Sequence, residues 1–174
     1  MEKSFQSVLH PRDKHDRFAE KGVMELSEEE RNKLLDYLEA EEYIPFCGFH
    51  VSANKIKAVY AGLYSEEVYA CKILVQNGFD IYLLDEKYVG GKKADAFFEK
   101  GGRRDFLELK HTKDKKITGL YNDSIEQAPN CFIVIDGYMS KVQKKNLNDA
   151  VYKNDRSKEV YVYLKRTGEF IKIK

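Results

Sequence analysis

Two short apolar segments each carry charged side chains that could act together on a phosphodiester bond. Glu108 and Lys110 lie two residues apart in the segment 106–110, so in a β-strand both side chains project from the same face. Asp95 lies in the apolar segment 94–98, although aspartate is disfavoured inside strands. If the two segments form a hairpin, both carboxylates and the amine meet at its base. Taken alone, Glu108 and Lys110 also fit an ordinary solvated strand face.

A third carboxylate, Glu67, belongs to a helix predicted over residues 65–77. The positions three, four and seven residues after it share its face of the helix and are Ala70, Cys71 and Leu74. A carboxylate in line with such an apolar stripe is unfavourable unless it is paired or binds a metal ion. The alternative is a first-turn acid favoured by the helix dipole. The neighbouring Glu66 is rotated by about 100° towards solvent.

Together, these side chains are typical of a metal-dependent nuclease. Carboxylate oxygens from Glu67, Asp95 and Glu108 suit Mg²⁺ or Mn²⁺, and suit Zn²⁺ less well. A metal ion held there would lower the pKa of a bound water and stabilise charge on the scissile phosphate. Lys110 would position or deprotonate that water, or balance the charge of the transition state. We therefore expect the three acids and the lysine to be the catalytic residues.

The same positions resemble a known nuclease motif. In chain order the motif residues are Glu67-x-x-Ala70-x-x-x-Leu74-x-x-x-Gly78, Lys93-Ala94-Asp95 and Glu108-Leu109-Lys110. This arrangement looks like that of the PD-(D/E)XK restriction-endonuclease-like superfamily, with Ala94 in place of the proline of the motif name. The resemblance implies that Asp95 and Glu108 bind metal, that Lys110 is catalytic and that Glu67 completes the site. It also implies a core of one helix, three strands, a helix and a strand.

Within that superfamily, residues 95–136 are similar to the C-terminal toxin domains of contact-dependent inhibition (CdiA-type) proteins. Gln127 matches a polar position on the second helix of that core. Domains of this kind include DNases and tRNases. The resemblance therefore implies a toxin that acts on tRNA or DNA, with a cognate immunity protein as partner. Residues 10–22 resemble connector sequence of phage head-associated proteins, which indicates a module carried by a phage.

Two other functions fit the same sequence. Glu108, Lys110 and His111 could cleave RNA without a metal ion, by acid–base chemistry through the 2′-hydroxyl group. EDTA separates this mechanism from the metal-dependent one. A non-enzymatic phage structural or binding module would instead leave the carboxylates solvated, and Lys110→Ala would then change neither nucleic-acid degradation nor toxicity.

Basic side chains surround the proposed site, although the formal net charge of the whole chain is only +1. Residues 92–116 contain nine lysines and arginines against five acids, a local balance of +4. A phosphate backbone requires such a local basic surface. Lys100, Arg103 and Arg104 fit an ordinary charged hairpin tip equally well. The substrate-binding candidates are Lys93, His111, Lys113, Lys115, Lys116 and Gln127.

The length of 174 residues fits one domain with an appendage better than two full domains, and the hydrophobic fraction of 43% is enough for a core. The three cysteines are widely spaced and show no zinc-site pattern. No segment approaches the ~20 apolar residues of a membrane span, and the N-terminus lacks the apolar region of a signal peptide. We therefore expect no membrane partner. The expected site of action is the cytoplasm of a target or host cell, reached as part of a larger toxin or phage particle.

The alternation of helical and strand patterns predicts a mixed central β-sheet flanked by helices, with an N-terminal helical arm. The expected elements are an extended arm 1–25, a helix 27–42 opened by a capping box at Ser27, a break at Pro45 and Gly48, a short helix within 49–64, a helix 65–77, strands 79–84, 94–98 and 104–110, a helix 117–128, a strand 131–136, a helix 140–151 and a hairpin of 160–164 with 170–173. The expected domains are an arm and helical segment, 1–60, and a nuclease-like α/β domain, 61–174.

Overall fold

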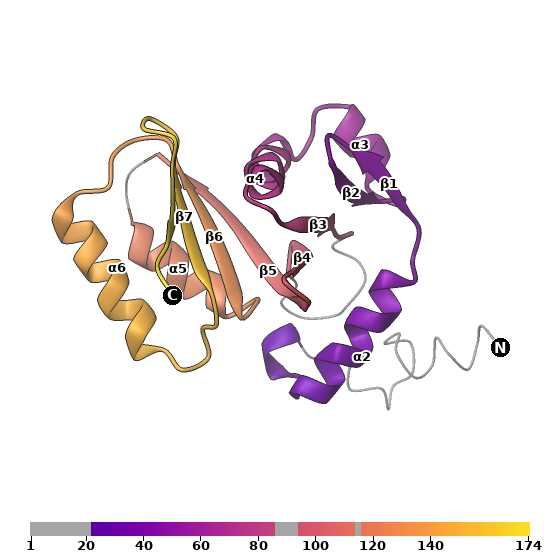
Figure 1. Cartoon of the computed structure of the whole chain (residues 1–174), viewed down its shortest axis with the longest axis horizontal. Coiled ribbons are helices and arrows are strands. Elements are labelled where there is room, and N and C mark those ends of the chain that lie inside the picture. The colour runs from indigo at the N-terminus through magenta and orange to yellow at the C-terminus, as the bar shows by residue number, and fades with distance from the viewer. Residues whose placement is uncertain (1–21, 86–93, 114–115) are drawn as a thin grey trace.

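A computed structural model describes residues 22–85, 94–113 and 116–174 and places eight strands in one mixed sheet (Figure 1). The strands follow one another across the sheet in chain order: β1 (Tyr43–Phe46), β2 (Phe49–Ser52), β3 (Asp80–Leu83), β4 (Ala96–Lys100), β5 (Arg103–Thr112), β6 (Asn130–Ile135), β7 (Val160–Leu164) and β8 (Glu169–Lys172). The helical elements are η1 (Val23–Glu25), α2 (Glu28–Glu39), α3 (Ile56–Tyr60), α4 (Ser65–Gln76), α5 (Ile117–Ile125) and α6 (Lys141–Lys153). The predicted α/β class is confirmed.

The sheet combines parallel and antiparallel pairs. β2 and β3, β5 and β6, and β6 and β7 are parallel, whereas the other neighbours are antiparallel. The run α4, β3, β4, β5, α5, β6 has the predicted order of one helix, three strands, a helix and a strand. In the described ranges, no helix combines the length and apolar character needed to cross a bilayer.

Helices cover both faces of the sheet, as the burial of β6 shows. All six residues of this strand are buried, as expected for a strand that is covered on both sides. Cys131 and Ile133 pack in one apolar cluster with residues of α5 and α6. Phe132 and Val134 pack in another cluster with residues of α3 and α4. Figure 1 shows the same arrangement, with α5 and α6 together on one side of β6 and α4 on the other.

The N-terminal third differs from the prediction in two places. The expected break is wrong at Pro45, which lies within β1, and is confirmed at Gly48, which lies in the turn of a two-residue hairpin formed by β1 and β2. Its turn residues Cys47 and Gly48 have φ values of 49° and 86°, the positive region that two-residue hairpin turns require. Pro45 is tolerated because β1 is an edge strand, where a ladder hydrogen bond is not needed on both sides. The predicted short helix exists as α3.

The prediction of an extended arm over residues 1–25 is also wrong at the C-terminal end of that segment. Val23 begins the 3-10 turn η1 and is fully buried in the apolar cluster that includes Leu34, Leu35 and Leu38 of α2. The predicted capping box of α2 is confirmed, since Ser27 and Glu30 exchange both hydrogen bonds. Residues 1–21, including the segment with phage-like sequence, lie outside the described part of the chain. The domain division at residue 60 stays a prediction, although β1 and β2 hydrogen-bond into the same sheet as the later strands.

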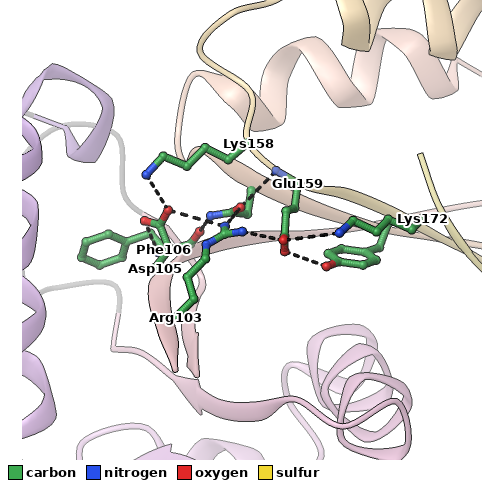
Figure 2. A network of polar contacts seen from close by, with 8 residues as sticks. Arg103, Asp105, Phe106, Lys158, Glu159 and Lys172 are labelled. Atoms are coloured by element: carbon green, nitrogen blue, oxygen red, sulfur yellow. Dashed lines mark hydrogen bonds and ion pairs between the residues drawn. The ribbon is translucent and has the colours of Figure 1, made fainter. Parts of the chain in front are cut away.

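A network of ion pairs and hydrogen bonds ties the start of β5 to the strands beside it (Figure 2). Arg103 contacts Glu159 and Asn130 at 2.5 Å each. The buried Asn130 side chain in turn donates to the backbone carbonyl of Phe106 at 2.8 Å. Asp105 lies within 3.1 Å of the Lys158 ammonium and 3.8 Å of Arg103. Through these contacts, β5, β6 and the loop before β7 are held in register at one end.

Candidate active site

Three of the four predicted catalytic side chains lie together where β4 begins and β5 passes it. Asp95 precedes β4 by one residue, and its Oδ2 accepts a hydrogen bond from the backbone N–H of Leu109 at 2.9 Å. Glu108 and Lys110 project from the same face of β5, and the Lys110 ammonium donates to Glu108 Oε1 at 2.8 Å. The alternation predicted from the sequence is confirmed, since Leu107 and Leu109 belong to the core cluster on the α4 side.

Glu108 is the most unusual of these groups, because its side chain is 2% exposed and incompletely neutralised. Its Oε2 is buried and has no hydrogen-bond donor among the described residues. Burial, followed by the charge of Asp95, raises the pKa of Glu108 to about 8. Two carboxyl groups can hydrogen-bond to one another only while one of them holds a proton. Glu108 and Asp95 therefore form a pair that attracts a proton or another cation.

The neighbours of Glu108 respond to the same environment. Burial raises the pKa of Asp95, against the lowering effects of the Leu109 N–H, Lys110 and Lys55. Burial opposes the charge on Lys110, but the hydrogen bond and charge of Glu108, together with Asp95, raise its pKa above the usual value. Lys110 is thus held as a cation beside two acids whose negative charge is only partly balanced.

Glu67 approaches the site from α4. As predicted, it is in line with the buried stripe that includes Ala70, Cys71 and Leu74. Its Oε2 lies 3.5 Å from the ammonium of Lys55. Burial raises the pKa of the Cys71 thiol, and the charges of Glu67 and Asp95 raise it further, so both acids lie close enough to act on this thiol.

The arrangement supplies carboxylate oxygens for a metal ion but no three-acid cluster. Within the described ranges, no group of three or more His, Cys, Asp or Glu side chains is arranged to hold a metal ion. The predicted metal set of Glu67, Asp95 and Glu108 therefore stays a prediction. The Asp95–Glu108 pair does fit a hard cation, because its oxygens are the donors that Mg²⁺ and Mn²⁺ prefer and Glu108 Oε2 lacks a donor.

A pocket of about 180 Å³ opens beside these side chains. Its lining residues are Glu66, Glu67, Ala70, Leu109, Lys110 and His111. His111 Nε2 lies 2.7 Å from Asp136 Oδ1, and His111 Nδ1 lies 3.6 Å from Glu66 Oε1. Asp136 follows β6 directly and has a pKa below its usual value, chiefly because of the hydrogen bond with His111. The pocket thus joins the Lys110 side of the site to an oriented histidine.

The predicted substrate-binding residues fall into two groups. Lys113 and Lys116 are exposed in the connection between β5 and α5, next to the His111 end of the strand. Gln127 is half-buried and lies just beyond the helix predicted to carry it, one residue after the C-cap of α5. Lys93 and Lys115 lie outside the described residues. The binding role of all these side chains stays a prediction.

No protein-family model matches the chain, and no curated protein matches it. Among solved structures, the chain is similar to the CdiA-CT/CdiI toxin and immunity complex from Burkholderia pseudomallei. The match has 18% sequence identity and a TM-score of 0.46, and covers 67% of this chain and 87% of the other. At that level the likeness carries no argument about activity or partner, so the function must be inferred from the site itself.

Two side chains at the site were not anticipated from the sequence. Lys55 lies before α3, a segment whose local pattern indicates nothing about a distant acid, so no signal for its pairing with Glu67 was available. Asp136 did carry a signal. It directly follows the buried strand β6. Because β6 runs parallel to β5, the Asp136 side chain is expected to lie near the end of β5.

Proposed function

We propose that the chain is a metal-dependent nuclease that hydrolyses phosphodiester bonds in tRNA or DNA. The observation that carries the proposal is the meeting of Asp95, Glu108 and Lys110, with a buried Glu108 oxygen that has no donor among the described residues. The structural acid Asp105 faces two cations, whereas the carboxyl groups of Asp95 and Glu108 share the ammonium of Lys110 in a buried place.

Asp95 and Glu108 would hold the ion, which when bound supplies Lewis-acid stabilisation and a water of lowered pKa. The protein holds these oxygens in place by different means. The Leu109 N–H fixes Asp95, and the Lys110 ammonium fixes Glu108. Because the raised pKa of Lys110 favours its charged form, this residue is better suited to stabilise negative charge on the phosphate than to remove a proton.

The substrate would reach the site along the pocket beside Lys110 and His111. The exposed Lys113 and Lys116 follow the His111 end of β5 in the chain and would neutralise phosphates outside the reacting bond. A toxin role with an immunity partner remains part of the proposal because the sequence motif resembles CdiA-type toxin domains.

The test is cleavage of plasmid DNA, bulk RNA and tRNA by the purified chain with Mg²⁺ or Mn²⁺, with and without EDTA. We expect cleavage of at least one substrate, inhibition by EDTA, and loss of activity in Asp95→Asn without loss of the folded state. Asp149→Asn is a matched control, because this aspartate is exposed on α6. Intact substrates under all conditions would refute the proposal.

A second candidate function is metal-independent RNA cleavage with His111 as the acid–base group. The specific observation in its favour is the 2.7 Å contact that orients His111 on Asp136 beside the Lys110 pocket. For this mechanism, RNA cleavage persists in EDTA and DNA stays intact. His111→Ala and Asp136→Asn should then reduce the rate by about 100-fold or more, whereas Asp95→Asn should have a much smaller effect.

A further inference from the structure

The ends of three parallel strands meet at one edge of the sheet, next to the candidate site. β5 and β6 are parallel, as are β6 and β7, so all three strands end on the same side. The Gly137 N–H donates to the carbonyl of Lys113 at 2.6 Å, and the Lys165 N–H donates to the carbonyl of Ile135 at 2.9 Å. Ligands of open α/β sheets commonly bind outside such strand ends. We call this region the strand-end surface, and its members are residues 111–113, 136–138 and 163–166 together with Tyr69 of α4.

A series of contacts joins the strand-end surface to the pocket beside Lys110. His111 lines that pocket, and its Nε2 lies 2.7 Å from Asp136 Oδ1. The Lys165 ammonium lies 3.6 Å from the same oxygen and 4.8 Å from the centroid of the Tyr69 ring. Its side chain is 46% exposed, so the charge faces solvent as well as Asp136. A polymer bound at this surface would therefore continue into the pocket.

Tyr138 and Arg166 form an exposed pair of an aromatic ring and a cation at the same surface. The Arg166 guanidinium lies 4.1 Å from the centroid of the Tyr138 ring, and Tyr138 is 62% exposed. Within residues 22–85, 94–113 and 116–174, no acid pairs with Arg166, so its charge is available to a ligand. Tyrosine rings and guanidinium planes both stack on nucleobases. Such stacking requires a base whose face is free, and a base inside a duplex is already stacked on both faces.

We propose that the strand-end surface binds unpaired nucleotides and thereby selects single-stranded segments of RNA or DNA for the candidate site. This inference rests on the proposed nuclease function and specifies its substrate. Tyr138 and Arg166 stack on a base, while Lys113 and Lys165 neutralise neighbouring phosphates. A surface that recognised charge alone would bind a duplex at least as well as a single strand, because the duplex carries phosphates on both strands.

The proposal is tested by fluorescence anisotropy with the full chain in EDTA, which prevents metal-dependent cleavage during the titration. The probes are a labelled DNA oligonucleotide of mixed sequence, the 2′-O-methyl RNA of the same sequence, and the duplex of each with its complement. The methylated RNA also resists cleavage through a 2′-hydroxyl group. We expect the wild type to bind at least one of the two single strands about tenfold or more tightly than the matching duplex.

Variants at the exposed pair test the stacking. Tyr138→Leu keeps an apolar side chain but removes the ring, so it should weaken single-strand binding by about tenfold and change duplex binding by less than about twofold. Tyr60→Leu is the matched control, because Tyr60 is 66% exposed on α3, and it should bind as the wild type does. Arg166→Met should also weaken single-strand binding, whereas Arg156→Met, which alters an exposed arginine before β7, should not.

The double variant Tyr138→Leu/Arg166→Met shows whether the pair acts as one unit. Its loss of affinity should be smaller than the product of the two single losses, because both side chains contribute to one stack. Equal affinity of the wild type for single strand and duplex, no binding of either single strand, or unchanged binding by folded Tyr138→Leu overturns the proposal and leaves the nuclease function to its own cleavage test. Selective single-strand binding without cleavage of any substrate supports the binding role of the strand-end surface and refutes the nuclease function instead.

Discussion

Strand β5 carries two buried carboxylates, three residues apart, in different surroundings. Asp105 is 4% exposed and faces two cations, with Lys158 at 3.1 Å and Arg103 at 3.8 Å. Its other oxygen accepts the N–H of Phe106 at 2.8 Å. Figure 2 shows this side chain in contact with Lys158 from the loop before β7 and with Arg103 of its own strand. Asp105 Oδ2, like Glu108 Oε2, has no hydrogen bond among the described residues, but the two cations balance its charge.

Glu108 is buried to a similar extent but is balanced differently. It has one lysine on Oε1, another acid as its neighbour, and an Oε2 without a donor among the described residues. The comparison teaches that burial of an acid does not by itself indicate a site. The incomplete neutralisation of Glu108 does indicate a site, because a fold that needed only a structural ion pair would supply the missing cation.

Neutralisation of Glu108 is expected to have the largest effect. Glu108→Gln should reduce cleavage by about 100-fold or more, because it removes a ligand oxygen from the reacting centre. It should not lower the free energy of unfolding above pH 8, because it removes a carboxylate that is costly to bury there. Rates with Mg²⁺ and urea unfolding of the metal-free chain check both parts. A clear loss of stability would make Glu108 a structural acid.

For Asp105→Asn we expect a loss of stability without a loss of cleavage. The amide keeps the shape of the side chain but leaves Lys158 and Arg103 without their buried counter-charge, so the free energy of unfolding should fall by about 1–3 kcal/mol. Cleavage per folded molecule should stay within about twofold of the wild type, as expected for a site outside the catalytic machinery. The check is urea unfolding beside initial rates; a rate that falls 100-fold would place Asp105 in the active site.

The stability of the fold should depend on pH through Glu108. Because the folded state raises the pKa of Glu108 from 4.5 to about 8, it binds more protons than the unfolded state within that window. The Glu108 contribution to stability should therefore fall as pH rises from 5 to 8, by at most about 1.4 kcal/mol per pH unit. Metal-free wild type and Glu108→Gln, unfolded in urea at several pH values, give the difference. If the free energy of unfolding changes equally with pH in the wild type and in Glu108→Gln, Glu108 ionises as an ordinary acid.

The smallest effect is expected at the rim of the Asp105 network. Lys172 lies 3.6 Å from Glu159, and its side chain is 56% exposed. Exposed pairs of this kind contribute less than about 1 kcal/mol, so Lys172→Met should change neither stability nor cleavage measurably. Thermal unfolding is sufficient to check this, and a large shift would mean that the network is more tightly coupled than its exposure indicates.

The sequence was informative where a short period sets the geometry. Strand alternation placed Glu108 and Lys110 on one face, and helical spacing placed Glu67 in line with a buried stripe. Asp95 was predictable because an acid beside apolar residues is rare in a strand. These three local rules were enough to propose a site.

Contacts between distant segments were not predictable. The Lys55–Glu67 pair joins residues with no common periodicity, and the hairpin of β1 and β2 depends on a turn whose Cys47 has a positive φ. Arg103 and Arg104 fitted a solvated hairpin tip by composition, but the structure pairs Arg104 with Asp36 and Glu39 of α2. Charge type alone does not tell whether a basic side chain meets a nucleic acid or an acid of its own chain.

In the proposed function, Lys110 acts with Asp95 and Glu108 on a phosphodiester. The most direct measurement compares cleavage of tRNA and plasmid DNA by wild type, Lys110→Met and Lys113→Met, all with Mg²⁺ and at equal folded concentration. Lys110→Met should be slower by about 100-fold or more, while Lys113→Met, which removes an exposed lysine just beyond β5, should lose at most about tenfold through weaker binding. Equal rates for wild type and Lys110→Met would contradict the account.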